Sequence, residues 1–279
     1  MISETFCKTI AGPLTVSGVG LHSGDRVEIT ILPSGEPGIY FDTPGGAVRA
    51  EARCVADTSR GTTLGQGEAR IMTVEHLMSA LWAIGIYAAR IHFSGREIPV
   101  LDGSSLGYLK ALEDVGTGPT DAVRRIYAPA SPVMVTRGDA FVCLLPGKGF
   151  TAEYHLNYDH PMIGAQTCVF DGSYGQYRQN IADSRTFVLY EEIEHLLSGN
   201  LAKGGSLDNC LVIFRDKLSS PLRHPAEPAG HKLLDLLGDA SLCGAGLEGR
   251  LIAYKSGHAL NTEFALRLQE QIETETASI

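Results

Sequence analysis

Both halves of the sequence show one order of elements, in which strands are followed by helices and the helices by another strand. In the clearest predicted strands, apolar and polar residues alternate, as they do where one face of a sheet is buried. The repeated order predicts two similarly built α+β domains, each with a sheet covered on one face by helices. The strands are predicted at 27–32, 90–93, 150–158 and 250–257, and the helices at 74–84, 188–198 and 229–243.

The helix at 74–84 has the clearest ends. Thr73 is suited to an N-cap, and Gly85 is suited to ending the helix. A polar, turn-rich stretch, GTGPTDAVRR at 116–125, follows the first set of elements. Because domain boundaries fall in stretches of this kind, we expect a first domain at residues 1–125 and a second domain at residues 126–279.

The composition excludes several classes of protein. With 44% hydrophobic and 20% charged residues, the chain is expected to be ordered. A net charge of −9 argues against binding to nucleic acid and allows at most a transient contact with an anionic membrane surface. The sequence has neither a signal-peptide pattern nor the roughly 18–20 consecutive apolar residues of a membrane span. We therefore expect a cytoplasmic monomer whose partner is a small molecule.

Several familiar sites lack their motifs. The six cysteines contain no C-x-x-C pair, so neither a disulfide scaffold nor a thiolate zinc cluster is indicated. The glycines of GVGLHSG at 18–24 do not have the G-x-G-x-x-G spacing of a dinucleotide site. The sequence also has no Walker A loop, no H-E-x-x-H motif and no G-x-S-x-G motif. GGSLDN at 204–209 is predicted to be a loop.

The helix at 229–243 carries a row of polar residues that has two interpretations. His231, Asp235 and Asp239 lie four residues apart, within about 80° of one another around the axis, and leucines occupy the opposite side. Such a row is most often the solvated face of a surface helix. The same spacing also allows an imidazole and a carboxylate to bind one ion at about 2.0–2.2 Å.

A catalytic zinc site takes three protein ligands and leaves one position for water, so a further ligand must come from elsewhere. His76, in the first turn of the helix at 74–84, is the leading candidate, because the helix dipole helps to keep its ring neutral there. Glu75 beside it is suited to act as a general base, and it is equally suited to complement the dipole. His258, on a loop after the last strand, is suited to donate to an oxyanion or a leaving amine, or is a surface histidine.

Eight segments occur in order along nearly the whole chain: SGVGLHSG, TTL with TVEHLMSAL, EIPVLDGSS, HPMIGAQ, SRTF, LAKGGSLDN, HKLLDLLGD and YKSGHALN. Together they resemble the zinc-dependent UDP-3-O-acyl-N-acetylglucosamine deacetylase family of bacterial lipid A biosynthesis. Their joint occurrence is far more specific than any single motif. The resemblance implies two α+β domains, each a mainly antiparallel sheet with helices on one face. It also implies that the helices are sandwiched between the two sheets, with the active site at the domain junction.

The resemblance implies a zinc site with a base and an acid beside it. TVEHL makes Glu75 the base, and Asp239 would orient His258 and favour its protonated form. The implied metal ligands are His76, His231 and Asp235. Since two histidines and a carboxylate also suit Fe²⁺, the resemblance leaves iron possible in place of zinc.

The resemblance also implies how a UDP-linked, acylated sugar is held. Lys232 would reach the phosphate or the sugar of the substrate. Thr186 would polarise the acetamide carbonyl, and Phe187 would pack on the glucosamine ring. The segment 188–205 would shape a hydrophobic passage for the acyl chain. Asp102 and His22 match family motifs without an implied role in the chemistry.

One segment departs from the family pattern. The family usually has a run close to DEFVRHK before the ligand helix, whereas this chain reads PAEPAGHK, with Pro228 and Gly230 in place of larger side chains. The departure leaves open a paralogue that acts on a different acyl- or nucleotide-sugar, or a non-catalytic nucleotide-sugar or lipid-binding protein. A metal-free α+β protein, in which the row of His231, Asp235 and Asp239 is only a solvated face, is a third possibility.

Overall fold

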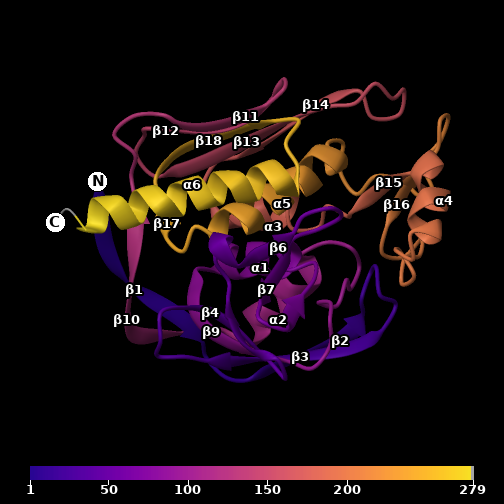
Figure 1. Ribbon diagram of the computed structural model, residues 1–279. Helices are drawn as coiled ribbons and strands as arrows, with labels where there is room; N and C mark the ends of the chain where they lie inside the picture. Colours follow the sequence, from indigo (N-terminus) through magenta and orange to yellow (C-terminus); the bar gives the residue numbers. More distant parts are fainter. Residues whose placement is uncertain (278–279) are drawn as a thin grey trace.

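The computed structural model describes residues 1–277, which form three layers (Figure 1). Helices α1 (Glu75–Ile84) and α5 (Glu227–Ser241) lie between one sheet at the bottom of the view and a second sheet at the top. This arrangement confirms the expected α+β class with helices between two sheets. Within residues 1–277, no helix is both long enough and apolar enough to cross a membrane. The other helices are α2 (Leu106–Val115), α3 (Tyr174–Asn180), α4 (Tyr190–Ser198), α6 (His258–Ala277) and the short 3₁₀ helix η1 (Ala52–Cys54).

The first sheet is built almost entirely from the N-terminal half of the chain. Its strands follow the order β17-β10-β1-β9-β3-β2, and β4 pairs with both β9 and β5. Four of the seven strand pairs are antiparallel, whereas β9 runs parallel to β1 and β4, and β10 runs parallel to β17. Its strands are β1 (Ile2–Ile10), β2 (Leu14–Val19), β3 (Arg26–Pro33), β4 (Gly38–Thr43), β5 (Gly46–Arg49), β9 (Ile86–Phe93), β10 (Thr117–Tyr127) and β17 (Gly246–Leu247).

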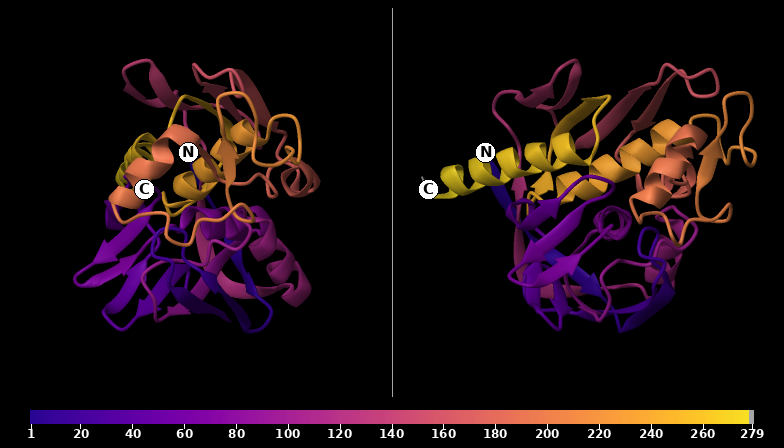
Figure 2. Two further views of the ribbon diagram at one scale, coloured as in Figure 1. Left: turned by 90° about the vertical axis from the view of Figure 1, so that its right-hand side faces the viewer. Right: turned by 45° about the vertical axis from the view of Figure 1, so that its right-hand side comes forward.

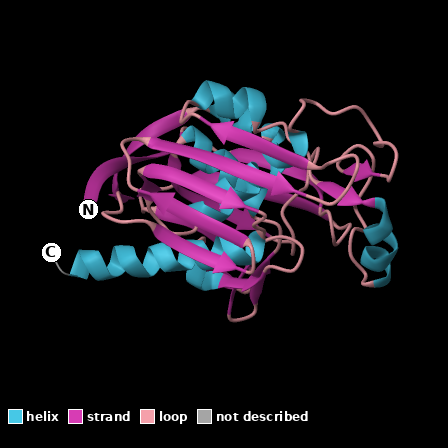
Figure 3. Ribbon diagram, turned by 90° about the horizontal axis from the view of Figure 1, so that it is seen from above, coloured by secondary structure: helices cyan, strands magenta, loops and turns pink. Residues whose placement is uncertain are grey.

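The second sheet comes from the C-terminal half and is seen from above in Figure 3. Its order is β11-β12-β18-β13-β14, and only the β13/β18 pair is parallel. Its strands are β11 (Val133–Arg137), β12 (Ala140–Leu145), β13 (Phe150–Asn157), β14 (Ala165–Phe170) and β18 (Gly249–Tyr254). Two small sheets complete the fold: β6 (Val55–Asp57), β7 (Thr63–Gln66) and β8 (Ala69–Ile71) form one, and β15 (Phe187–Leu189) and β16 (Leu211–Ile213) form the other.

Helix α5 is buried on both of its faces. Its four leucines, at positions 233, 234, 236 and 237, are at most 1% exposed, and the helix packs against β13, β14 and α1. Each such side chain contributes about 1.5–3 kcal/mol on burial. His231, Asp235 and Asp239, on the other side, are also at most 3% exposed. The interpretation of this row as a solvated face is therefore wrong.

The turn-rich segment predicted at 116–125 is instead strand β10. It pairs antiparallel with β1 from Thr117 to Tyr127, with one irregularity in register, and its end also pairs with β17. Alternate residues of its first part, Thr117, Pro119, Asp121 and Val123, are exposed, so residues of low strand propensity are tolerated there. The division of the chain into two domains near residue 125 remains a prediction.

The helix ends differ from those predicted in four places. Helix α1 begins at Glu75, and Thr73 is not its cap: Thr73 has a φ of 61° and donates from its hydroxyl to Glu97. Helix α4 begins at Tyr190 because the residues before it form β15. Helix α5 begins at Glu227, with Pro228 in its first turn, where a missing N–H does no harm. His258 is the first residue of α6 and does not lie on a loop. Gly85 does end α1, in the left-handed conformation.

Candidate active site

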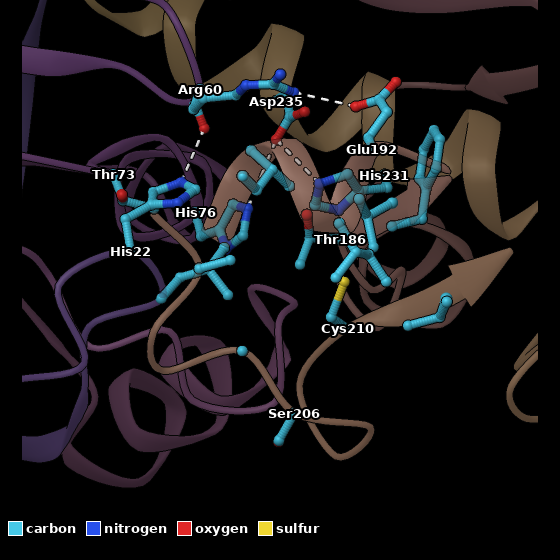
Figure 4. Close-up of a pocket in the computed structure, with 18 of the residues that line it drawn as sticks. His22, Arg60, Thr73, His76, Thr186, Glu192, Ser206, Cys210, His231 and Asp235 are labelled. Atoms are coloured by element: carbon cyan, nitrogen blue, oxygen red, sulfur yellow. Dashed lines mark hydrogen bonds and ion pairs between the residues drawn. The ribbon is translucent and has the colours of Figure 1, made fainter. Parts of the chain in front are cut away.

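Helices α1 and α5 bring His76, His231 and Asp235 together between the two sheets (Figure 4). The Nε2 atoms of His76 and His231 lie 3.6 Å and 3.5 Å from Asp235 Oδ1. The two rings meet edge to face, with their centroids 5.1 Å apart. All three side chains are buried, and one potential ligand atom from each lies within 4.8 Å of the others. The three residues form a possible metal site.

The geometry and electrostatics of this group suit a metal ion. Two ligand atoms about 2.1 Å from a tetrahedral ion lie about 3.4 Å apart, close to the distances found here. Asp235 Oδ1 is buried and has no hydrogen-bond partner in the described chain. His231 Nδ1 donates to the carbonyl oxygen of Ser184 at 3.1 Å, so Nε2 carries the lone pair. Burial lowers the pKa of His231 to about 3, which keeps its ring neutral as a ligand must be.

Charge around the group also favours a cation. Burial by itself would raise the pKa of Asp235. The attraction of His231, Lys232 and His258 for the carboxylate outweighs burial and holds this pKa well below its usual value. Burial likewise opposes protonation of His76, but Asp235 and Glu75 outweigh burial and raise the pKa of His76. A positive charge is therefore stabilised beside Asp235, and a divalent ion supplies such a charge.

Glu75 faces the same space from the first turn of α1. It is 2% exposed, and one of its oxygens accepts a hydrogen bond from the backbone N–H of Thr62 at 2.9 Å. Its other oxygen lies 3.9 Å from His258 Nε2. Burial raises the pKa of Glu75 above its ordinary value. A carboxylate of raised pKa next to a metal site is suited to accept a proton.

His258 lies beside Glu75 and is held by Asp239. Its Nδ1 donates to Asp239 Oδ2 at 3.0 Å, and its Nε2 lies 3.9 Å from Asp235 Oδ2. Burial lowers the pKa of His258, but Asp239, Glu75 and Asp235 outweigh burial and raise this pKa to about 9. The imidazolium form is therefore favoured near neutral pH, and Nε2 is left to donate a proton.

A cavity of about 500 Å³ opens beside these residues. Thr186, Phe187 and Lys232 all line it, and Lys232 Nζ is 3.1 Å from Asp235 Oδ2 and 5.8 Å from the centre of the Phe187 ring. The segment 188–205 and the loop at 204–209 supply an apolar wall that includes Ile193, Leu196, Leu197 and Leu207. Figures 1 and 2 show β15, β16 and α4 projecting from one end of the sandwich.

The two motif residues without an implied role lie in different surroundings. His22 lines the cavity, is 7% exposed and donates from Nε2 to the carbonyl oxygen of Arg60 at 3.1 Å (Figure 4). Asp102 does not line the cavity and forms an ion pair with Arg223 at 2.8 Å. The structure therefore adds His22 to the walls of the cavity and gives Asp102 a place in a surface ion pair.

Comparison with known proteins identifies the family. The family model for LpxC, UDP-3-O-acyl N-acetylglycosamine deacetylase, matches residues 7–270. The chain belongs to this family. The resemblance seen in the motifs is thereby confirmed, and the match includes every residue placed in the cavity above.

Curated relatives cover nearly the whole chain, and each is named UDP-3-O-acyl-N-acetylglucosamine deacetylase. The protein from Synechocystis sp. is 39% identical over 274 residues, which is 94% of this chain and 98% of the relative. The protein from Campylobacter hominis is 38% identical over 265 residues, covering 93% of this chain and 90% of the relative. The protein from Anaeromyxobacter sp. (strain Fw109-5) is 38% identical over 259 residues, covering 91% of this chain and 85% of the relative.

The departure from the family pattern before His231 is accommodated by local packing. A Cβ at Gly230 would lie 2.4 Å from Ser184 Oγ and 2.9 Å from the ring of His224. His224 Nε2 and Ser184 Oγ are hydrogen-bonded at 2.8 Å, so His224 fills the space beside Gly230. Glu227 at the start of the helix is fully buried and paired with Arg185. The ligand helix therefore begins normally despite the replacements.

Three residues of the site were missed at the level of sequence. Thr62 donates from its hydroxyl to Asp239 at 2.5 Å and from its backbone to Glu75, and Asn261 donates to Asp239 at 3.0 Å. Ser184 orients His231 through its carbonyl oxygen. The TTL, SRTF and YKSGHALN segments contain these three residues, so the motifs were a signal. Their roles are hydrogen bonds to residues of other segments, which no spacing within one segment reveals.

Gly238 allows α1 and α5 to approach each other closely. A Cβ at this position would lie 2.2 Å from the carbonyl oxygen of Glu75, so the helix pair must separate to admit one. We expect Gly238→Ala to lower the free energy of unfolding by about 1–3 kcal/mol, as overpacking does elsewhere, and to reduce metal affinity. Denaturant unfolding and chelator competition measure the two effects.

Gly175→Ala is the matched control for this substitution. Gly175 lies in helix α3, where a Cβ would meet no atom within 4 Å. We expect this variant to be unchanged or about 0.5–1 kcal/mol more stable, since alanine is the better helix former. If Gly238→Ala had the same free energy of unfolding as the wild type, this result would contradict the close contact between α1 and α5.

Proposed function

We propose that the protein is a metal-dependent deacetylase that acts in the biosynthesis of lipid A. It hydrolyses the N-acetyl group of a UDP-3-O-acyl-N-acetylglucosamine and releases acetate and the free amine. The observation that carries this proposal is the convergence of His76, His231 and Asp235, with Glu75 and His258 facing the same space. Family membership supports the substrate class. We further propose that the enzyme works as a cytoplasmic monomer with its site between two domains that divide near residue 125.

Zinc is the metal that we propose. Two imidazole nitrogens and one carboxylate oxygen form a common ligand set for catalytic zinc, and Fe²⁺ is the alternative that the same set permits. His76, His231 and Asp235 would hold the ion. When bound, the ion supplies a water of lowered pKa and a Lewis acid next to the acetamide carbonyl.

The proton transfers fall to Glu75 and His258. Glu75 accepts a proton from the attacking water through the oxygen that does not bind Thr62. His258 donates from Nε2 to the leaving nitrogen, while Asp239 holds its Nδ1. The hydroxyl of Thr186 donates to the carbonyl oxygen as negative charge develops on it. The acid and the base thus lie side by side at the site, with His258 Nε2 3.9 Å from Glu75 Oε1.

The cavity accounts for recognition of the substrate. Lys232, anchored beside Asp235, presents its ammonium group to the phosphate or the sugar. Phe187 packs on the glucosamine ring. The apolar wall formed by α4 and the loop at 204–209 takes the acyl chain. A carbohydrate with a long apolar chain and an anionic diphosphate matches these three surfaces.

Release of acetate from the UDP-acyl-sugar tests the proposal. Purified protein should release one acetate for each substrate molecule consumed. Acetate release should stop after treatment with a chelator and should resume when zinc is added. Binding of the substrate without acetate release would favour the non-catalytic paralogue. Protein prepared without chelators and free of stoichiometric metal by elemental analysis would contradict the proposed metal site.

The dependence of kcat on pH should be bell-shaped. The rate falls at low pH as Glu75 becomes protonated, and burial moves this limb above the ordinary carboxylate pKa of 4.5. The rate falls at high pH as His258 loses its proton, at a pKa of about 9 without a metal. Because a bound cation opposes protonation, we expect this limb to lie below pH 9.

The variant Asp239→Asn tests the high-pH limb. Loss of the carboxylate beside His258 removes an attraction that raises the pKa of the histidine. We expect the high-pH limb to move to lower pH. A profile with an unchanged high-pH limb would contradict His258 as the acid.

A further inference from the structure

Arg185 and Glu227 form an ion pair that is almost completely buried. Their side chains are 7% and 0% exposed. The guanidinium group donates from Nε to Oε1 at 2.7 Å and from Nη2 to Oε2 at 3.1 Å, which is the two-point geometry that arginine makes with a carboxylate. Neither residue lines the cavity, so neither touches the substrate.

Every nitrogen of the guanidinium group and both oxygens of the carboxylate have at least one hydrogen-bond partner. Arg185 donates from Nη1 to Ser220 Oγ at 2.7 Å and from Nη2 to the carbonyl oxygen of Pro221 at 2.9 Å. Glu227 accepts further bonds from the backbone N–H groups of Arg185 and Arg223, at 3.1 Å and 2.8 Å. A pair satisfied in this way holds its two backbones at one distance and one orientation.

The two backbones that the pair joins both lead to the active site. Glu227 is in the first turn of α5, one turn before the ligand His231. Arg185 lies between Ser184, whose carbonyl oxygen accepts from His231 Nδ1, and Thr186, which lines the cavity. The backbone N–H of Thr186 in turn donates to the carbonyl oxygen of Gly103 at 2.7 Å.

We propose that the Arg185–Glu227 pair positions His231 for metal binding and the hydroxyl of Thr186 for the acetamide carbonyl. By fixing segment 184–186 against the start of α5, the pair keeps the Ser184 carbonyl oxygen at His231 Nδ1. This contact selects the tautomer in which Nε2 carries a lone pair toward Asp235. Arg185 and Glu227 are positioning residues, and this inference rests on the proposed function of the site.

The substitution Arg185→Lys tests the inference, because lysine keeps the charge and loses the two-point contact. We expect zinc to bind the metal-free variant about 10–100-fold more weakly, as found when a partner of a ligating histidine is removed. Chelator competition measures the affinity. We expect kcat to fall while KM changes little, and the visible spectrum of the Co²⁺-substituted variant to differ from that of the wild type.

Arg90→Lys is the matched control. Arg90 contacts Asp42 with Nε at 2.8 Å and also with Nη2, in a two-point pair on β9 and β4 of the first sheet. We expect its zinc affinity and its Co²⁺ spectrum to equal those of the wild type. A loss of zinc affinity equal to that of Arg185→Lys would show a general effect on folding and would overturn the inference.

Three results separate this inference from the proposed function. If the wild type binds neither zinc nor Fe²⁺, or releases no acetate, the proposed function is wrong. If the wild type does both and Arg185→Lys binds zinc as tightly, only the positioning role is wrong, even when thermal stability falls. If Arg185→Lys does not fold, Glu227→Gln takes its place, since glutamine keeps the shape of the glutamate side chain. Unchanged zinc affinity and unchanged ¹⁵N chemical shifts of the His231 ring in Glu227→Gln would overturn the positioning role of the pair.

Discussion

Replacing Glu75 with glutamine is expected to lower kcat by about 10²–10⁴-fold, the usual contribution of a general base, and to leave zinc bound stoichiometrically. The amide keeps the shape of the side chain and still accepts a hydrogen bond from the N–H of Thr62. It does not accept a proton from water. Initial rates of acetate release and elemental analysis of the same preparation measure the two quantities.

Glu68→Gln provides the control for this variant. Glu68 is exposed on the turn between β7 and β8, away from the cavity, and its replacement should change neither rate nor metal content. Near-normal deacetylation by Glu75→Gln would mean that another group is the base. Loss of zinc together with the rate would mean that Glu75 acts by holding the metal.

Replacing Asp235 with asparagine is expected to weaken zinc binding by more than the roughly 10–100-fold seen for residues that only orient a ligand. Its Oδ1 atom lies within 3.6 Å of both ligand nitrogens and is the negative charge of the proposed ligand set. The amide keeps the volume but loses this charge. Turnover should fall with metal content and recover only partly in excess zinc.

Asp42→Asn is the corresponding control. Asp42 pairs with Arg90 in the first sheet and takes no part in the cavity, so zinc affinity should remain that of the wild type. Unfolding of both variants in the presence of a chelator gives the stability without metal. Wild-type zinc affinity in Asp235→Asn would remove Asp235 from the ligand set.

Much of the fold was predictable because the signals for it are local. The alternation in 150–157 and the leucine face of α5 reflect the periods of strand and helix, which any window of the sequence displays. Strand β10 was not predictable in the same way. Its glycine, proline and aspartate residues favour a turn locally, whereas pairing with β1, more than a hundred residues earlier, and with β17 at its end stabilises it as a strand.

The active site likewise has a part that the local sequence predicts and a part that depends on tertiary packing. The turn of a helix places His231, Asp235 and Asp239 on one face whatever surrounds them, because this depends only on local backbone geometry. Whether that face meets water or metal depends on another helix. Packing of α1 against Gly238 excludes solvent and brings Glu75 and His76 to the row.

The spacing of residues along the chain thus defined which side chains share a face, and the family motifs indicated their chemistry. Folding decided the rest: that the row is buried, that Thr62 and Asn261 hold Asp239, and that Arg185 pairs with Glu227 behind His231. These contacts join residues that lie 22 to 177 positions apart in the sequence. Short-range backbone geometry governs periodicity, whereas contacts across the core arise only when packing brings distant segments together.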